Sequence, residues 1–231
     1  MRPRGAFPSP RHRLAGAIPH RIVGATPSQF LWKPARLSMW LNDVDGDCVT
    51  AEEAFAKACY SPEIFITDAT VKTWASKNGV LNGANLWQVL NLMQSGGFPQ
   101  DGLIYDDGPF TSVEWTDAAI VQNAITHGPV KLGVAGDQLE SVVPQSVANG
   151  WIATHFTPDP NEDHCISLCG YGTMESLSKQ LAGHVPEGVK WSEPAYAIFT
   201  WSSIGIIDVP SLLAITGEAW LRNPTSVVVN I

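Results

Sequence analysis

The chain has 231 residues, of which 45% are hydrophobic and 16% are charged, a balance typical of a globular protein with a core of ordinary size. Its apolar stretches, such as residues 198–201, are far shorter than the roughly 20 residues of a membrane-spanning helix, which excludes such a span. All 22 acidic residues lie at or after Asp43, whereas seven of the 14 basic residues precede it. The charge pattern therefore predicts a basic arm over residues 1–40 and an acidic domain over residues 41–231.

The arm is expected to be extended, because proline at positions 3, 8, 10, 19, 27 and 34 blocks any long helix. The arginines near its start are not followed by an apolar segment of about 7 to 15 residues, so the sequence predicts no secretion signal. It has few aromatic residues and no run of adjacent basic ones, which argues against nucleic-acid binding. We expect the arm to lie on an acidic surface, either of its own domain or of a neighbouring subunit.

The first half of the domain is predicted to be helical. Hydrophobic residues recur at roughly helical spacing in residues 48–60, and a second short helix is expected at residues 69–76. The clearest pattern begins at Leu86, where apolar residues are three and four apart until Gly96 and Gly97 end the helix.

Thr116 is expected to cap a further helix that runs to the break at Gly128 and Pro129. A late helix is expected at residues 211–221, although Gly217 weakens it by about 1 kcal/mol relative to alanine. Short apolar runs bounded by turn residues predict strands that begin near Val130, Cys165, Ala195, Ile204 and Ser226. Helices followed by strands predict an α+β fold.

Cys48 is the first candidate for catalytic chemistry, because it stands at the start of the helix predicted for residues 48–60. Free backbone N–H groups and the helix dipole at such a position lower the pKa of a thiol. An arbitrary cysteine is more often a small buried side chain, which is how we interpret Cys59, Cys165 and Cys169. Since the cysteines lack the paired spacing of a metal site, all four are expected to be free thiols, as in a reducing compartment.

The turn before Cys48 has a second interpretation. Asp43, Asp45 and Asp47 alternate in the way that the first three ligands of a calcium loop do. The sixth position of such a loop needs glycine and is Cys48, and the twelfth needs an acidic ligand and is Ala54. The pattern therefore disfavours calcium, and no metal or cofactor is expected.

His164 is the second candidate, because it opens an apolar strand that closes with Gly-Tyr-Gly at residues 170–172. A lone histidine is more often structural, but an imidazolium and a thiolate brought together from distant parts of a chain form an activated nucleophile pair. Five histidines have no such context: His12, His20, His127, His155 and His184.

Several segments, in the same order along the chain, resemble the papain family of cysteine peptidases. That family has an amide side chain six residues before its nucleophile, which donates to the oxyanion, and Asn42 stands six residues before Cys48. Its catalytic histidine follows Asn or Asp and precedes a strand ending in Gly-Tyr-Gly, as Asp163 and His164 do here. The Gly-Pro-Val of residues 128–130 is also similar to a strand start of that family.

A closer similarity is to the papain-like proteins of bacteriophages and prophages, which carry an Asn-Asp-x-x-Gly-Asp-Cys turn and a late Thr-Trp-Gly strand. Residues 42–48 match the turn, and Thr200 and Trp201 match the strand, where Ser202 replaces the glycine. The resemblance covers residues 40–222. It implies an α+β papain-like fold, in which a helical lobe with the nucleophile helix packs against an antiparallel β lobe.

The chain departs from the family at the group that orients the base, which is an Asn or Asp near the late tryptophan. Here that position holds Phe199, Thr200 or Trp201, of which only Thr200 is able to accept a hydrogen bond from an imidazole N–H. Val49 replaces the aromatic residue that commonly follows the nucleophile. Asp47, directly before the thiol, raises the thiol pKa if its side chain points inward.

Two functions follow from the resemblance. In the first, a cysteine peptidase or amidase, Cys48 attacks the acyl carbon of a peptide or amide substrate and His164 transfers the proton. Asn42 and the backbone N–H of Cys48 then bind the oxyanion, and Thr200 is the candidate for orienting the base.

In the second, a catalytically weak or inactive scaffold is a structural or assembly protein of a virus particle. Its arm then contacts neighbouring protein subunits of an oligomer. An arm folded into its own cleft instead indicates a self-inhibited zymogen. On any of these hypotheses the protein is expected in the cytoplasm of a bacterial host or in the virion, away from membranes.

Overall fold

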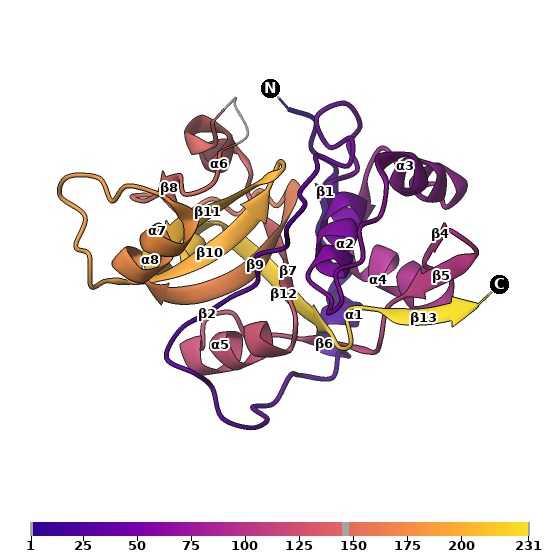
Figure 1. Ribbon diagram of the computed structural model, residues 1–231, viewed down its shortest axis with the longest axis horizontal. Coiled ribbons are helices and arrows are strands. Elements are labelled where there is room, and N and C mark those ends of the chain that lie inside the picture. Colours follow the sequence, from indigo (N-terminus) through magenta and orange to yellow (C-terminus); the bar gives the residue numbers. More distant parts are fainter. Residues whose placement is uncertain (1, 145–147, 231) are drawn as a thin grey trace.

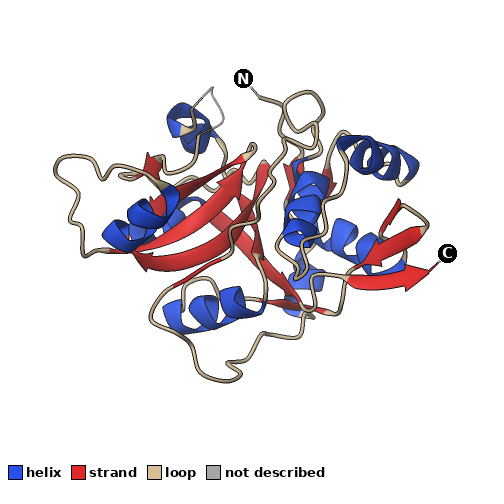
Figure 2. Cartoon of the chain, in the orientation of Figure 1, coloured by secondary structure: helices blue, strands red, loops and turns tan. Residues whose placement is uncertain are grey.

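The predicted helices and strands form two lobes, so the class is α+β. The computed structural model describes residues 2–144 and 148–230. Figure 1 shows a lobe built on a large sheet on the left and a mainly helical lobe on the right. Coloured by secondary structure, the chain shows most of its strands in the first lobe, and the C-terminal strand lies in the second (Figure 2). No helix in these ranges is both long enough and apolar enough to cross a membrane.

Three helices form most of the helical lobe, within two residues of the bounds that hydrophobic spacing predicted: α2 (Cys48–Ala58), α3 (Asp68–Lys77) and α4 (Leu86–Ser95). Thr67 and Asn85 cap α3 and α4 by accepting backbone N–H groups. Two small sheets complete this lobe, a parallel pair and an antiparallel sheet in the order β13-β5-β4. Their strands are β1 (Ala6–Phe7), β3 (Ala84–Asn85), β4 (Phe98–Gln100), β5 (Leu103–Asp106) and β13 (Val227–Asn230).

The other lobe contains an eight-stranded sheet in the order β6-β12-β7-β9-β10-β11-β8, with β2 paired to β9. Its pairs are antiparallel except that of β8 with β11. Its strands are β2 (Phe30–Leu31), β6 (Phe110–Ser112), β7 (Val130–Val134), β8 (Ile152–Ala153), β9 (His164–Thr173), β10 (Pro194–Thr200), β11 (Ser203–Asp208) and β12 (Thr216–Arg222). Four helices pack around it: α5 (Ala118–His127), α6 (Asp137–Val142), α7 (Met174–Leu181) and α8 (Val209–Ile215).

Strand β9 is buried on both faces. Successive side chains of a strand point to opposite faces of the sheet. Cys165 and Cys169 belong to the core shared with α2, whereas Ile166 and Leu168 belong to the core on the other side. Packing on both faces therefore fixes the strand that begins at His164 and the direction of its first side chain.

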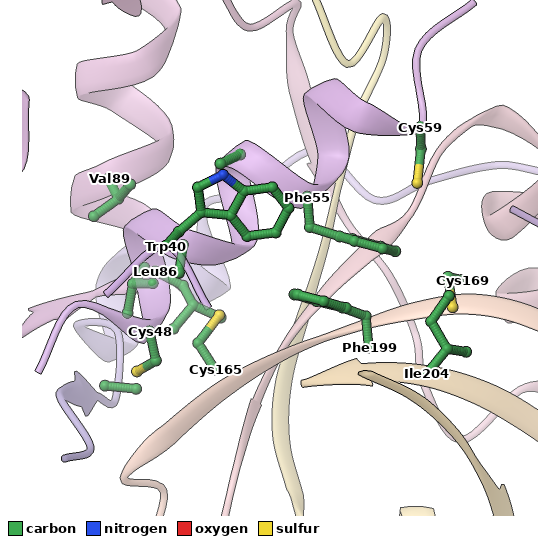
Figure 3. Packing of buried hydrophobic residues seen from close by; sticks show 14 of the residues in the cluster. Trp40, Cys48, Phe55, Cys59, Leu86, Val89, Cys165, Cys169, Phe199 and Ile204 are labelled. Atoms are coloured by element: carbon green, nitrogen blue, oxygen red, sulfur yellow. The ribbon is translucent and has the colours of Figure 1, made fainter. Parts of the chain in front are cut away.

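Helix α2 is buried along its whole length against the sheet. The ring of Phe55 stacks on Phe199 with centroids 4.0 Å apart, and Trp40 meets Phe199 edge-on at 5.8 Å. Figure 3 shows this aromatic contact together with Cys48 at the start of α2 and Cys165 on β9. Each large apolar side chain buried in this way contributes about 1.5–3 kcal/mol. The packing thus holds the N-terminus of α2 against β9.

Six charged side chains are also buried between α2 and the sheet, three acidic and three basic: Glu52, Glu53, Asp107, Lys57, Lys131 and Arg222. The ammonium of Lys131 lies 2.8 Å from Glu52 Oε2, also contacts Glu53, and donates to the carbonyl oxygen of Val49 at 2.7 Å. Because Val49 follows Cys48, Lys131 connects β7 to the first turn of α2.

The cap predicted for α5 is wrong by one residue. Asp117 stands at the N-cap, where its carboxylate accepts the N–H groups of Ala119 and Ile120. The hydroxyl of Thr116 instead donates to Glu114 at 2.6 Å. Aspartate is preferred over threonine at the N-cap, and Asp117 is the residue whose carboxylate faces the free N–H groups.

The helix predicted for residues 211–221 is also wrong in its second half. Helix α8 ends at Ile215, and β12 follows at once between β6 and β7. Its pairing with β7 shifts register around Gly217, where an added Cβ would overlap the carboxylate of Glu162. Pairing on both edges outweighs the weak helical propensity of this segment.

The arm packs on its own chain. Its strand β1 pairs in parallel with β3, and β2 joins β9. Between them, the short helix α1 (Arg11–Ala15) places the guanidinium of Arg13 over the ring of Trp87, 4.0 Å from the centroid. Arg4 forms ion pairs with Asp137 and Asp163, so the arm meets acidic residues of its own domain. A contact with a neighbouring subunit stays a prediction.

Candidate active site

Cys48 is the first residue of α2, and it is 1% exposed. Although the helix start lowers a thiol pKa, burial outweighs it and raises the pKa of Cys48 to about 11. Backbone hydrogen bonds from Gly5 and Cys165 act in the opposite direction, and the charge of Asp47 raises the pKa further. The thiol is therefore protonated at neutral pH. The other three cysteines are also buried and free.

His164 is fully buried at the first position of β9, and its ring is held on two sides. Its Nε2 lies 2.8 Å from the hydroxyl oxygen of Thr200, and its ring stacks on Trp201 with centroids 4.3 Å apart and planes 14° apart. Its Nδ1 has no hydrogen-bond partner. Burial, followed by the charges of Arg4 and Arg2, lowers the pKa of His164 to about 3. The imidazole is therefore neutral at pH 7.

The turn between β10 and β11 places the groups around the imidazole. Thr200 is the last residue of β10, and Trp201 and Ser202 follow with φ of 44° and 64°. Two successive positive φ angles are typical of the tight turns that join antiparallel strands and favour glycine. Ser202 thus occupies a left-handed position that favours glycine.

Two side chains of the turn before α2 are buried without hydrogen-bond partners for their oxygens. They are Asn42, through Oδ1, and Asp47, through both carboxylate oxygens. Burial, followed by the charge of Asp45, raises the pKa of Asp47 to about 8. Asp47 is thus mostly neutral at pH 7. Once ionised, Asp47 opposes ionisation of the neighbouring thiol, but burial is the largest cause of the high pKa of Cys48.

The N-terminal arm crosses this site between the two lobes (Figure 1). The backbone N–H of Ala6 donates to the carbonyl of Asp163 at 3.1 Å, and the carbonyl of Gly5 accepts the N–H of Ala84 at 2.8 Å. An added Cβ on Gly5 would overlap the carbonyl oxygen of Gly46. Only glycine therefore fits at position 5 while the arm lies in this place.

Two arginines of the arm lie on the His164 side of the site. Arg4 forms an ion pair with Asp163 at 2.7 Å, and the guanidinium of Arg2 lies over the ring of Trp201, 4.9 Å from its centroid. Asp163 precedes His164 in the chain and Trp201 stacks on it. The arm therefore covers the imidazole as well as the thiol.

The candidate residues come together in part. Thr200 contacts His164 directly. The two candidate catalytic residues meet neighbouring residues of the arm: Cys48 lies beside Gly5, and His164 lies beside Arg4. The catalytic roles of these residues and of Asn42 stay predictions. The sequence did not single out Gly5 or Arg4. The excess of basic residues in the arm predicted contact with an acidic surface, but it did not predict where on the domain that surface lies.

The aspartates of the turn before α2 are not arranged as a metal site. Asp45 forms an ion pair with Lys72 at 3.0 Å, and Asp47 is buried as described above. In residues 2–144 and 148–230 there is no group of three or more His, Cys, Asp or Glu side chains that could hold a metal ion.

Cysteine proteases are among the solved structures to which this chain is similar. No family model and no curated protein matches the sequence. The Amb a 11 cysteine protease of ragweed pollen, in its proform, is similar with a TM-score of 0.62 at 12% identity, over 92% of this chain and 73% of that one. Xylellain, a cysteine protease from Xylella fastidiosa, gives 0.61 at 11% identity, over 96% and 97%.

A third similar structure is the digestive procathepsin L 3 of the Tenebrio molitor larval midgut, with a TM-score of 0.60 at 10% identity over 90% of this chain and 73% of that one. The chain therefore has the fold of the papain-like cysteine proteases, as the sequence resemblance implied.

Proposed function

We propose that this chain is a papain-like cysteine hydrolase, a peptidase or amidase, that its own N-terminal segment, residues 2–9, holds in a closed state. The observation that supports this most is the hydrogen bond between Thr200 and His164, because a structural remnant has no need of an oriented imidazole. The fold, and the position of Cys48 at the start of a buried helix, agree with it.

The closed state explains why neither group of the pair is charged. Burial raises the pKa of Cys48 and lowers that of His164, so the proton stays on sulfur. A thiolate and an imidazolium need water or each other's charge for stabilisation, and Gly5 and Arg4 occupy the space beside them. Departure of the arm lets water enter and favours proton transfer from Cys48 to His164.

In the open state the chemistry is that of an acyl transfer to sulfur. The thiolate of Cys48 attacks the acyl carbon, and the backbone N–H of Cys48 and the amide of Asn42 stabilise the oxyanion. The imidazolium of His164 then gives its proton to the leaving amine. Water, deprotonated by His164, releases the acid and regenerates the thiol. Thr200 accepts the N–H of the other ring nitrogen and keeps the imidazole oriented.

A second candidate is the inactive scaffold of a virus particle. The neutral states of Cys48 and His164 and the lack of an Asn or Asp at position 200 favour it, since a retired site keeps its packing but not its ionisation. On this proposal the arm is an assembly device that contacts neighbouring subunits. Phage or prophage origin and location in the host cytoplasm or virion belong to the proposals that rest on the sequence resemblance.

Hydrolysis by an opened full-length chain separates the two candidates. Gly5→Ala introduces a Cβ that overlaps Gly46 and displaces the arm, whereas Gly96→Ala is a matched control, because no atom lies within 4 Å of the added Cβ. We expect Gly5→Ala to cleave a mixed library of quenched fluorescent peptides, and wild type and Gly96→Ala to be at least about 10-fold slower. Addition of Cys48→Ala should abolish cleavage. An opened chain that cleaves nothing supports the scaffold.

A further inference from the structure

The guanidinium of Arg4 contacts three acidic side chains of the sheet lobe, of which Asp137 is 65% exposed, Asp163 30% and Glu140 21%. It lies 2.5 Å from Asp137 Oδ1, 2.7 Å from Asp163 Oδ2 and 3.5 Å from Glu140 Oε2, and the Arg4 side chain is 9% exposed. Together these three acidic residues are called the acidic pocket below. In this structure the guanidinium of Arg4 fills the pocket. Arg4 belongs to the arm, which leaves the site in the proposed mechanism.

The acidic pocket is built by two elements that converge next to the imidazole. Asp137 and Glu140 lie three residues apart on α6, and Asp163 immediately precedes β9. Asp163 Oδ1 accepts the backbone N–H of Gly136 at 2.8 Å, which connects the start of α6 to that of β9. The pocket is therefore held in place by backbone contacts and does not depend on Arg4 alone.

The position of the pocket relative to the thiol follows from two neighbouring arm residues. The backbone of Gly5 lies beside the thiol of Cys48 and lowers its pKa, and the side chain of the preceding residue, Arg4, fills the pocket. An added Cβ on Gly136 would lie 2.8 Å from Arg4 Cδ and 2.9 Å from His164 Cβ. Along the arm, the pocket is therefore one residue away from the position next to the thiol, in the direction of the imidazole.

A second observation indicates that this side of the site receives a ligand. Nδ1 of His164, whose ring is close enough to Arg4 for that charge to lower its pKa, is buried and has no hydrogen-bond partner. In the proposed reaction the imidazolium gives its proton to the leaving amine, so the leaving group lies on the side of His164. A side chain at the position of Arg4 is therefore the side chain that follows the bond to be cleaved.

We propose that the acidic pocket selects a basic side chain, arginine above all, immediately after the scissile bond of a peptide substrate. This deepens the proposed function and rests on it. When the arm leaves, three carboxylates are left without the cation that Arg4 provides, and a substrate cation restores the pairing. The planar guanidinium of arginine donates hydrogen bonds to carboxylates in two directions, whereas the ammonium of lysine is a single point charge. Arginine therefore fits the acidic pocket better than lysine does.

The neighbouring contacts of Arg2 extend the same preference. The backbone N–H of Arg2 donates to Glu140 at 2.6 Å, and its guanidinium donates to the carbonyl of Pro144 at 2.9 Å and lies over Trp201. A substrate with a second basic residue two positions further from the thiol would meet the same groups. The arm thus presents to the site the side chains that the proposal assigns to substrates.

Binding tests the pocket whether or not the chain hydrolyses anything. The probe is a fluorescent peptide of residues 1–9, and its partner carries citrulline, the uncharged analogue, in place of Arg4. Both are titrated by anisotropy into the full chain carrying Gly5→Ala and Cys48→Ala. We expect the arginine peptide to bind at least about 10-fold more tightly, and Asp137→Lys in this chain to remove the difference.

Cleavage tests the specificity, with two quenched peptides that differ only by Arg or Gln after the scissile bond and with the Gly5→Ala chain. We expect a ratio of kcat/KM of at least about 10 in favour of Arg, and a ratio near one after Asp137→Lys. Glu187→Lys, the same charge change at an exposed loop residue, should preserve the ratio. Cleavage of both peptides at equal rates overturns the pocket but not the hydrolase.

Failure of the hydrolase has a different signature. If no peptide is cleaved but the arginine peptide binds more tightly than the citrulline peptide, and Asp137→Lys removes that difference, the pocket stands as a cation-binding site and the proposed hydrolase falls. Equal binding of the two peptides overturns the pocket.

Discussion

The hydroxyl oxygen of Thr200, the last residue of β10, lies 2.8 Å from Nε2 of His164. The next residue, Trp201, stacks on the same imidazole ring. With Nε2 occupied in this way, the nitrogen that remains for chemistry is Nδ1, which has no partner. A neutral hydroxyl orients the ring without stabilising an imidazolium as a carboxylate does. On the proposed function, Thr200 therefore orients the base but stabilises its charged form less than a carboxylate does.

Replacing Thr200 tests this substitution. In the Gly5→Ala chain, Thr200→Val removes the acceptor at nearly constant volume, and we expect kcat to fall about 10- to 100-fold with little change in KM, because the interaction acts on the base. Thr200→Asn should retain at least the original kcat. Thr154→Val, which removes a threonine 2.9 Å from Nδ1 of the exposed His155, is the matched control. An unchanged kcat in Thr200→Val means that the bond does not orient a base.

The buried charges between the lobes make a second prediction. Lys131→Met leaves Glu52 and Glu53 short of a cation in the interior, and we expect the free energy of unfolding to fall by about 3–5 kcal/mol in urea titrations. Lys179→Met removes a surface pair with Glu175 and should cost no more than about 0.5 kcal/mol. Similar small losses in both variants would show that the buried network contributes little.

Asp47 gives the structure a dependence on pH with a definite sign. Its pKa is raised to about 8 from 3.8, so the native state holds more protons than the unfolded chain between about pH 4 and 8. The contribution of Asp47 to the free energy of unfolding is therefore largest below about pH 4 and is lost as the pH rises from about 4 to 8. We expect Asp47→Asn to raise the free energy of unfolding by about 2 kcal/mol at pH 7 and by little at pH 4.

The control for this pH effect is Asp101→Asn, because Asp101 is exposed. Urea unfolding of both variants at the two pH values is the measurement. A gain in Asp47→Asn that is equal at both pH values would contradict the raised pKa, since removal of an ordinary exposed carboxyl shows no such difference.

Much of the fold could be predicted from local patterns, because α2, α4 and the strands β7, β9, β10 and β11 each bury apolar residues in one or both of the two cores. The predictions failed where contacts with residues far away in the sequence determine the secondary structure. Thr216–Arg222 has weak local preference and becomes a strand between β6 and β7. Helix α7 was not predicted, since its sequence is mostly polar and its start depends on a capping box between Thr173 and Ser176.

The candidate site divides in the same way. Cys48 and His164 stand in motifs with characteristic neighbours, so the sequence alone could single them out. It left the orienting position open among Phe199, Thr200 and Trp201, because one residue of register reverses the face of a strand. The location of Gly5 depends on contacts with residues about 40 and 80 positions away, and no local pattern encodes such contacts.

The most direct test of the account is the reactivity of the Cys48 thiol in the full-length chain, measured by limited iodoacetamide labelling between about pH 5 and 9 with mapping by mass spectrometry. With its pKa at about 11, only about one Cys48 thiol in ten thousand is ionised at pH 7 in the closed state, so wild type should label slowly.

Gly5→Ala should label selectively at Cys48 below pH 7, and addition of His164→Ala should abolish that selectivity, because the imidazolium is what stabilises the thiolate. Gly96→Ala should behave as wild type. If Cys48 of the Gly5→Ala chain labels no faster than Cys59, Cys165 and Cys169, then opening the arm creates no ion pair, and the proposal of a self-closed cysteine hydrolase is wrong.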